Sequence, residues 1–338
     1  MKTIIKTERL FLREMTEADH DALYKVLADS DIMQQNPYAF DEARVHGWIE
    51  RNIERYRASG FGLWALCIRE SGEMIGDCGL TMQSIKGMTC PEIGYHIRKD
   101  KQGQGYAKEA AAAVRDWAFE NTPFRTLYSY MKYTNVPSSS TAVSIGMRFT
   151  QEYADETNEI TKVFAITKAQ WLYLGNDWQF RKADLGDKGA VKALYASVIG
   201  SEYCTWNEFY PGDEEINTDI ANGNLYVLAD GRDIIGAISV VSENELGELA
   251  FWHETSGARE IARVVVSPAS FQGKGIAGIL LEKIEQVLSE EGCKIIHLLA
   301  AVRNIPAYKL YLKAGFEVRG RCDMYGNTYY ACEKQIIG

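Results

Sequence analysis

Apolar residues along this chain recur with two different periods, and together they predict alternating helices and strands. After a short strand-like start, helical spacing covers about residues 17–29 and 41–58. Strand-like runs follow at Leu63–Ile68 and Met74–Thr81, and Ser71-Gly72 supplies the turn of a hairpin. Strands mixed with helices in this order predict an α/β fold whose sheet is covered on both faces.

The same order of elements returns in the second half of the chain. A second hairpin is predicted at Asn224–Asp230 and Asp233–Val241. A strand-like run ends near Lys168, turn-forming residues follow, and a new strand-to-helix pattern begins after Gln179. We therefore expect two tandem domains, residues 1–172 and 178–338.

A glycine-rich loop is also present twice, 170 positions apart, each time between a strand-like run and an amphipathic helix. An asparagine with a glycine eleven residues later follows each loop, as Asn135 with Gly146 and Asn304 with Gly315. So long a period indicates a duplicated domain, because solenoid repeats run at roughly 20–50 residues. The two loops are Gln102-Gly103-Gln104-Gly105-Tyr106-Ala107 and Gln272-Gly273-Lys274-Gly275-Ile276-Ala277.

The chemistry of such a loop favours an anion. Glycines let backbone N–H groups approach a ligand closely, and the helix start adds unpaired donors and a positive dipole end. A phosphate or pyrophosphate suits this arrangement. Neither copy has the Walker pattern or the third glycine of the dinucleotide fingerprint. A plain surface turn is the remaining alternative, and the duplication with matching flanks argues against it.

The strand, glycine loop, helix and Asn-helix order resembles the acetyl-CoA core of the GNAT superfamily of N-acetyltransferases. The C-terminal copy carries it in Arg263–Pro268, Asn304–Tyr311 and Ala314-Gly315-Phe316. The N-terminal copy resembles the RimJ/RimL-type branch through Thr7–Arg13 and Glu92–Tyr95. The resemblance implies two tandem GNAT-type domains, each a mixed, mostly antiparallel twisted sheet flanked by helices. It also implies that acetyl-CoA is the co-substrate.

Composition narrows the partners and the compartment. A net charge of −9 provides no basic excess for binding nucleic acid, and no apolar run reaches the ~18 residues that span a bilayer. The first residues lack the apolar core of a signal peptide. Seven scattered cysteines form no C-x-x-C pair, so neither a disulfide framework nor a metal site is indicated. We expect a soluble, cytoplasmic protein.

Acetyl transfer to an amine needs a base for the ammonium proton and an acid for the departing thiolate. The resemblance implies that Tyr311, seven residues after Asn304, is the acid. In the N-terminal copy the matching residue is Ala142, which cannot donate a proton. Ser138 could hydrogen-bond near the thiolate there, or could simply begin a helix.

Glu260 and Glu92 begin the strands before the two loops, where several family members have a catalytic glutamate. Glu260 stands twelve residues before Gln272, whereas Glu92 stands ten residues before Gln102. Compared with the N-terminal copy, the C-terminal copy has one extra residue between Val266 and Gln272. A difference of two requires a bulge if both carboxylates are to occupy the same place. An exposed charge at a strand end and a proton relay through water are the alternatives to a catalytic base.

The remaining expected site residues follow from the resemblance. Aromatic and acidic residues would suit the acceptor amine, although such residues also pack at the borders of loops; these are Trp206, Glu208, Tyr210, Trp252 and His253. We interpret His96 as a strand residue with satisfied polar groups. The residues expected to bind acetyl-CoA are Ile97, Val264, Val265 and Val266, both glycine loops in full, and Asn135 and Asn304.

Three functions fit these observations. The first is an N-acetyltransferase acting on a primary amine of a small molecule or peptide, with the C-terminal domain catalytic and the N-terminal domain active or only binding acetyl-CoA. The second is a non-catalytic acyl-CoA sensor, which Tyr311 disfavours and Ala142 favours in its own half. The third is a domain kept only for assembly, which two intact loops disfavour. The sequence identifies neither the acceptor nor the oligomeric state.

Overall fold

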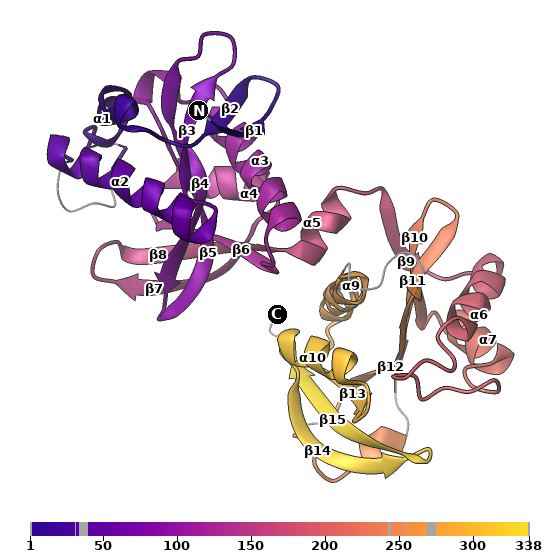
Figure 1. Ribbon diagram of the computed structural model, residues 1–338. Helices are drawn as coiled ribbons and strands as arrows, with labels where there is room; N and C mark the ends of the chain where they lie inside the picture. The colour runs from indigo at the N-terminus through magenta and orange to yellow at the C-terminus, as the bar shows by residue number, and fades with distance from the viewer. Residues whose placement is uncertain are drawn as a thin grey trace. The chain divides into compact units, whose positions relative to one another are not determined.

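The computed structural model describes residues 2–30, 32–33, 40–242, 245–253, 255–268 and 275–336. The chain divides into two compact units, Met1–Trp171 and Leu172–Gly338. Each unit holds its own sheet with its own helices (Figure 1). In the part of the chain that is described, no helix is long and apolar enough to cross a membrane.

The N-terminal unit contains an eight-stranded sheet in the order β1-β2-β3-β4-β5-β6-β8-β7. Neighbouring strands are antiparallel except β5 and β6, which run parallel. The predicted hairpin at residues 63–81 is confirmed, and its second strand extends beyond the prediction to Ile85. The strands are β1 (Thr3–Lys6), β2 (Leu10–Arg13), β3 (Leu63–Ile68), β4 (Met74–Ile85), β5 (Met88–Ile97), β6 (Thr126–Lys132), β7 (Arg148–Asp155) and β8 (Glu159–Thr167).

Helices cover both faces of this sheet, as the sequence predicts (Figure 1). Strand β3 shows why, because alternate side chains enter opposite cores. Trp64 and Leu66 pack in the core beneath α3, while Leu63 and Ala65 pack in the core beneath α1 and α2. The helices are α1 (His20–Leu27), α2 (Glu42–Ser59), α3 (Tyr106–Asn121), α4 (Val136–Ser144) and α5 (Lys168–Leu174).

The C-terminal unit repeats this arrangement with one strand fewer, in the order β14-β15-β13-β12-β11-β10-β9. Its neighbouring strands are antiparallel except β12 and β13, which run parallel and are the counterparts of β5 and β6. The strands are β9 (Trp178–Lys182), β10 (Leu225–Asp230), β11 (Asp233–Val241), β12 (Arg259–Val266), β13 (Ile295–Ala301), β14 (Glu317–Met324) and β15 (Asn327–Gln335).

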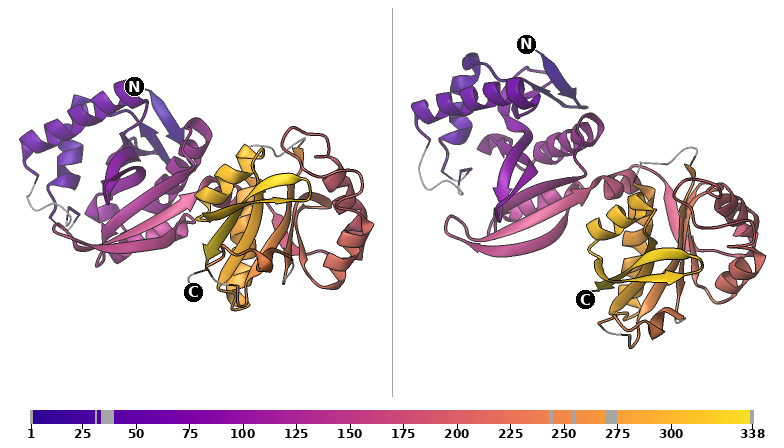
Figure 2. Two further views of the ribbon diagram at one scale, coloured as in Figure 1. Left: turned by 90° about the horizontal axis from the view of Figure 1, so that it is seen from below. Right: turned by 60° about the horizontal axis from the view of Figure 1, so that its bottom comes forward.

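Two helical layers cover the C-terminal sheet as well. Val191 of α6 and Ile216 of α7 share a core with Val265 of β12. On the opposite face Leu280 of α9 approaches Gly236 so closely that a Cβ there would lie 3.0 Å from it. Figure 2 shows these layers from two further directions. The helices are α6 (Lys188–Ala196), α7 (Asp213–Ala221), α9 (Ile276–Glu290) and α10 (Ile305–Lys313).

Candidate active sites

The N-terminal glycine loop connects β5 to α3 with two residues in the left-handed region. Gly103 has φ 73° and Gly105, the N-cap of α3, has φ 81°. Only glycine adopts such angles without strain, which explains both glycines of the motif. The Gln102 side chain closes the loop onto the strand, donating from Nε2 to the backbone oxygen of Ile97 at 2.8 Å.

Residues near the N-terminus hold this loop in place. Glu109 of α3 accepts from Thr7 Oγ1 at 2.6 Å and from Arg9 Nε at 2.6 Å. The Arg9 guanidinium lies 4.7 Å from the centre of the Tyr106 ring and donates to the backbone oxygen of Gln104 at 2.9 Å. The Thr7–Arg13 segment therefore supports the loop, which the sequence alone does not reveal.

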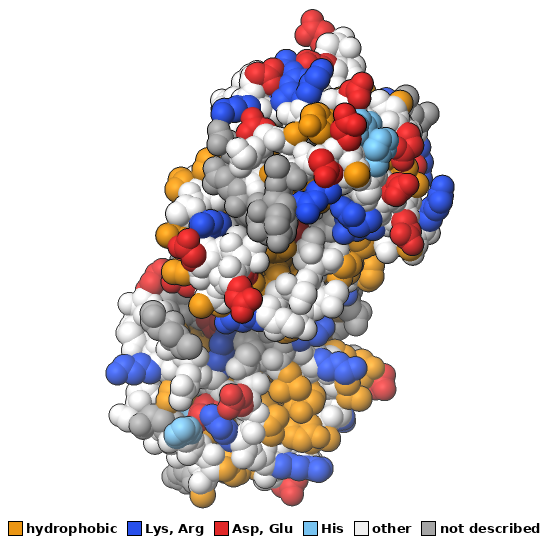
Figure 3. Space-filling view, turned by 90° about the vertical axis from the view of Figure 1, so that its left-hand side faces the viewer, with side chains coloured by type: hydrophobic (Ala, Val, Ile, Leu, Met, Phe, Trp, Pro, Cys, Tyr) orange, Lys and Arg blue, Asp and Glu red, His pale blue; other side chains and the backbone are white. Residues whose placement is uncertain are grey.

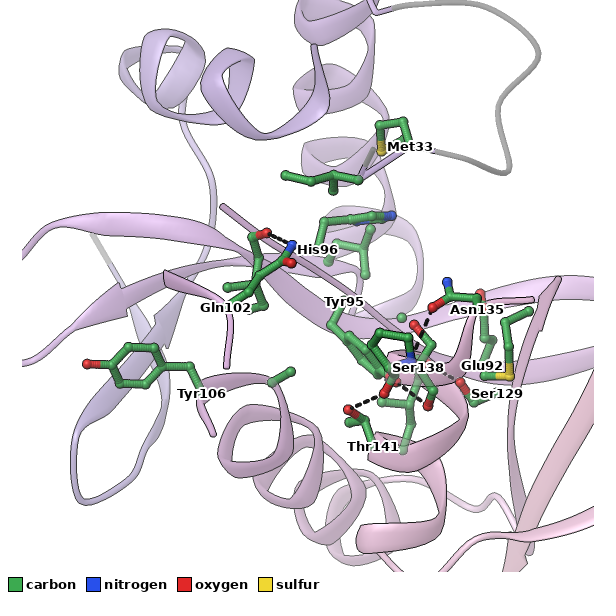
Figure 4. A pocket seen from close by; sticks show the side chains of 18 of the residues that line it. Met33, Glu92, Tyr95, His96, Gln102, Tyr106, Ser129, Asn135, Ser138 and Thr141 are labelled. Carbon is green, nitrogen blue, oxygen red and sulfur yellow. Dashed lines mark hydrogen bonds between the residues drawn. The ribbon is translucent and has the colours of Figure 1, made fainter. Parts of the chain in front are cut away.

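The loop lines a cavity of about 850 Å³. The expected residues Ile97, Gln102, Gly103, Gly105, Tyr106 and Ala107 are among its walls, and so are Glu92, Asn135 and Ser138. Gln104 is not among the lining residues, and its side chain donates instead to the backbone oxygen of Asp100 at 3.2 Å. The fold thus brings most of the N-terminal predictions to one cavity (Figure 4).

Strand β5 and helix α4 meet at one end of this cavity. Asn135 caps α4, and its Oδ1 accepts from the Ser138 backbone N–H at 3.2 Å. The Tyr95 hydroxyl reaches the same turn and donates to the Ser138 backbone oxygen at 3.0 Å (Figure 4). Ala142 is fully buried one turn further along. A phenol therefore does reach α4 in this domain, but it comes from the strand rather than from the helix.

Glu92 contributes the carboxylate of the cavity. Burial raises the pKa of Glu92 to about 7, although Thr81 Oγ1 donates to its Oε2 at 3.3 Å. A carboxyl group with a pKa near neutrality can accept a proton from an amine and release it again at physiological pH. This behaviour is expected of a general base.

His96 is held by partners within the fold. Its Nδ1 lies 2.7 Å from Oδ1 of Asp77, and the other carboxylate oxygen accepts from Trp48 Nε1 at 2.9 Å. Burial opposes the imidazolium form, but Asp77 raises the pKa of His96. His96 and Trp48 both line the cavity. The interpretation of His96 as a satisfied strand residue agrees with these contacts.

The C-terminal copy has the same left-handed glycine and the same asparagine helix cap. Gly275 has φ 84° and is the N-cap of α9, and the side chain of Asn304 caps α10 by accepting from the Ala307 N–H at 3.1 Å. Ile276 is buried, and Ile276 and Ala277 form the first turn of α9. Val264, Val265 and Val266 are the last residues of β12. Gln272, Gly273 and Lys274 lie outside the described residues.

Tyr311 lies on α10 where the spacing predicts it, between the start of the helix at Ile305 and the left-handed Gly315. Its side chain is buried, with the ring centre 5.9 Å from that of Phe316. Burial raises the pKa of the Tyr311 hydroxyl above its ordinary value. The hydroxyl is therefore protonated at neutral pH, as a proton donor must be.

Glu260 and Glu92 occupy the same level of their sheets. On β4 the partner of Glu92 is Thr81, five residues after Gly76, and on β11 the partner of Glu260 is Val241, five residues after Gly236. Glu92 stands five residues before Ile97, the partner of Gly76, whereas Glu260 stands six before Val266, the partner of Gly236. A bulge at Ala262, between Ile261 and Arg263, makes this possible. It absorbs one of the two residues by which the spacings differ, and the other is the extra residue between Val266 and Gln272.

Burial also raises the pKa of Glu260 to about 7. Its Oε2 is fully buried and has no hydrogen-bond partner among the described residues. A neighbouring network surrounds Arg263, whose Nη2 donates to Asp219 Oδ2 at 2.6 Å and whose Nη1 donates to the Tyr210 hydroxyl at 2.9 Å. Ser239 Oγ donates to the same Asp219 oxygen at 2.7 Å.

The structure does not bring the expected acceptor-side residues into one cluster. Tyr210 contacts Arg263, and Trp206 packs edge-on against Tyr195 with ring centres 5.3 Å apart. Trp252 stacks on His297 of β13 at 3.9 Å. The backbone N–H of His253 donates to Glu333 at 2.9 Å, and Glu208 is exposed. Among these five, the Tyr210 hydroxyl is the group tied to the face that carries Glu260.

Comparison with known proteins identifies both halves. Residues 9–148 match the model described as acetyltransferase (GNAT) domain, and residues 192–316 match the acetyltransferase (GNAT) family. The chain belongs to the GNAT acetyltransferase family. It carries two GNAT domains in tandem, as predicted.

Individual relatives of this GNAT protein cover about half of it. Uncharacterized protein YkkB of Bacillus subtilis (strain 168) is 32% identical over 151 residues, 44% of this chain and 88% of the relative. Uncharacterized N-acetyltransferase YnaD of the same organism is 26% identical over 173 residues, which are 49% of this chain and 98% of the relative. The crystal structure of the acetyltransferase from Agrobacterium tumefaciens str. C58 is 30% identical, with TM-score 0.43, covering 49% of this chain and 94% of that one.

The sequence motifs do not identify several residues that the two domains place at these sites. Tyr95 stands within a family marker; strand alternation puts it on the same face as Ile93 and on the opposite face from His96, and only the fold shows that this face meets α4. Asp77 and Trp48 lie 19 and 48 positions from His96 along the chain, and no local signal joins them to it. Arg51 and Arg55 of α2 line the cavity, but in the sequence they are only polar positions of an amphipathic helix.

Proposed function

We propose that this protein transfers the acetyl group of acetyl-CoA to a primary amine, with the C-terminal domain supplying both a base and an acid. Glu260 takes the ammonium proton, the amine nitrogen bonds to the carbonyl carbon, and the carbon–sulfur bond breaks. Tyr311 then gives a proton to the thiolate. The observation that carries this proposal is the pair of strand glutamates, matched in level by the bulge, each with a pKa of about 7.

The donor-substrate residues fit acetyl-CoA. Left-handed glycines at Gly103, Gly105 and Gly275 place no Cβ beside the helix-start N–H groups. Lys101 and Lys108 also line the N-terminal cavity, and their charge suits phosphates. We assign Asn135, Asn304 and the strand ends at Ile97 and Val264–Val266 to the pantetheine and thioester side.

In the N-terminal domain we assign the base to Glu92 and the thiolate donor to Tyr95. The Tyr95 hydroxyl lies at the first turn of α4, beside Ser138, and burial raises the pKa of Tyr95 to about 12. A neutral phenol at this place can replace the donor missing at Ala142. Ser138 lines the same cavity and is the competing donor.

The experiment is a panel of primary amines with acetyl-CoA, read by release of free thiol, on the full chain. Isothermal titration with acetyl-CoA should give two sites, and Gly105→Glu and Gly275→Glu should each remove one, because each change adds bulk, charge and strain at a left-handed residue. Binding without turnover of any amine would instead support the acyl-CoA sensor. A wild-type stoichiometry of one would show that one loop does not bind.

A further inference from the structure

The N-terminal cavity has a basic wall that donor binding through the glycine loop does not explain. Arg51 and Arg55 lie one turn apart on α2, and both line the cavity together with Glu92 and His96. Helix α2 covers the sheet face opposite α3, the helix that begins at the glycine loop. Figure 3 views the α1–α2 side and shows several Lys and Arg side chains there, interspersed with Asp and Glu side chains.

These two arginines differ from four others in this domain. Arg9, Arg13, Arg98 and Arg115 each pair with a carboxylate at 2.5–2.6 Å. Arg51 and Arg55 have no such ion pair among the described residues. Arg55 Nη1 donates only to the neutral Asn52 Oδ1 at 3.2 Å, and the Arg51 guanidinium lies 5.8 Å from the Trp48 ring centre.

Their proximity is electrostatically unfavourable in the free protein. Burial and the neighbouring charge of Arg51 together lower the pKa of Arg55. Arg51 is exposed and Arg55 is partly buried. The two guanidinium groups repel each other, and their proximity becomes favourable when an anion lies between them, since each offers a planar fork of donors to carboxylate or phosphate oxygens.

Glu92 supplies the opposite charge close by. Arg55 and Glu92 interact electrostatically, and each affects the pKa of the other. The wall therefore presents a carboxylate and two cations within one cavity. A ligand complementary to it has an ammonium group at one end and an anionic group a few bonds away.

We propose that the N-terminal domain acetylates a small primary amine that also bears a carboxylate or phosphate group, held by Arg51 and Arg55 while its nitrogen faces Glu92. This inference rests on the proposed function. It adds the chemical class of the acceptor, and the arginines act as specificity-determining residues. Acetyl transfer itself proceeds as above, with the amine proton passing to Glu92 and the thiolate leaving as coenzyme A thiol.

The test uses the full chain with Gly275→Glu, so that turnover reports on the N-terminal domain. Two pairs of probes differ in the anionic group: β-alanine against propylamine, and O-phosphoethanolamine against ethanolamine. The anionic member of a pair should have a kcat/KM about tenfold higher or more, because a charge-assisted, bidentate contact is among the stronger hydrogen bonds. The pair with the larger ratio distinguishes carboxylate from phosphate.

Variants locate the effect. Arg51→Gln and Arg55→Gln should raise KM for the anionic probes about tenfold or more and leave KM for the neutral amines nearly unchanged. Arg57→Gln is the matched control, because Arg57 lies on the same helix, is exposed and does not line this cavity. Arg51→Gln is the cleaner of the two tests, since Arg55 also acts on the pKa of Glu92. Thermal unfolding checks that each variant is folded.

Three outcomes would overturn the proposal. Equal kcat/KM within both probe pairs would show that no anionic group is recognised. A rise in KM for acetyl-CoA, rather than for the acceptor, would show that the arginines bind the donor substrate. Absence of thiol release with every amine, from wild type as well, would refute the proposed function and with it the acceptor site.

Discussion

The two domains have the same strand order and register but differ on the sheet face that carries the glutamates. In the N-terminal domain the residue opposite Gly79 is Gly94, which lines the cavity beside Glu92. In the C-terminal domain the residue at the same level, opposite Ser239, is Arg263. Its side chain is almost fully buried against Asp219 and Tyr210. At this one position, the glycine of the N-terminal domain leaves space in the cavity, whereas the arginine of the C-terminal domain fills the corresponding space with a charged network.

The proposed proton donors differ in a complementary way. Tyr311 belongs to α10, whereas its counterpart Ala142 on α4 has no functional group. Tyr95 extends from β5 to α4, and its counterpart in the C-terminal strand is Val264. Duplicated domains can thus keep a phenol at the same helix while the residue that carries it moves to another element.

The largest expected effect comes from removing these phenols. Tyr311→Phe should lower kcat about 10²–10⁴-fold for turnover by the C-terminal domain, measured in the Gly105→Glu chain, because the ring stays and only the donor is lost. Tyr95→Phe should do the same in the Gly275→Glu chain. Acetyl-CoA binding, followed by titration, should persist in both.

The matched control for the first domain is Ser138→Ala, which removes the competing hydroxyl. Loss of turnover in Ser138→Ala, with Tyr95→Phe active, would assign the donor to the helix. Wild-type turnover in Tyr311→Phe would contradict the acid assignment in the second domain.

Breaking the network at Arg263 should destabilise the C-terminal unit. Asp219→Asn keeps the shape but leaves a buried guanidinium uncompensated, and such losses cost about 3–5 kcal/mol of unfolding free energy. Asp213→Asn is the control, since Asp213 pairs with Lys188 and Lys192 on an exposed part of α7 and should change little. Denaturant unfolding followed by tryptophan fluorescence measures both. Equal effects would mean that the network is not structural.

The two glutamates should make activity and stability respond to pH in opposite directions. A base with a pKa of about 7 gives kcat/KM that rises with pH through about 7, and Glu260→Gln or Glu92→Gln should remove the limb in its own domain. A limb that follows the pKa of the acceptor amine and ignores both substitutions would favour proton transfer through water.

Stability follows from the same shift. Because the folded pKa lies above the unfolded value, the folded state binds the proton more tightly, so this contribution is complete below about pH 4.5 and is lost as pH rises through about 7. Each Gln variant should therefore show a flatter dependence of unfolding free energy on pH between these values. An unchanged slope would mean that burial does not raise the carboxyl pKa.

The smallest effect is expected at the glycine that keeps the N-terminal cavity open. A Cβ at Gly94 would meet Leu63 Cδ2 at 3.5 Å and Glu92 Oε2 at 3.8 Å, both ordinary contacts, so Gly94→Ala should change stability by no more than about 1 kcal/mol. Its cross-strand partner Gly79 is the contrast, because a Cβ there would lie 2.0 Å from the Gly62 backbone oxygen. Gly79→Ala should cost about 1–3 kcal/mol or more. A large loss in Gly94→Ala would show that its small size serves folding.

The sequence by itself determined the duplication, the α/β fold, the family and the helix caps. These depend on local periodicity and on backbone rules that each residue carries with it, such as the left-handed glycines at Gly105 and Gly275 and the side chains of Asn135 and Asn304. It also predicted a bulge before the second loop, on the condition that Glu260 and Glu92 occupy the same place, because their spacings to the loops differ by two residues.

Tertiary structure decided which charges meet. Arg263 finds Asp219 across 44 residues, His96 finds Asp77 across 19, and Arg51 and Arg55 find no carboxylate partner among the described residues. Whether a charge is neutralised, buried or left facing a cavity depends on which elements pack together, and spacing along the chain does not report it. For the same reason Tyr95 is an ordinary strand residue in the sequence, and only the packing of α4 beside it makes it a candidate donor.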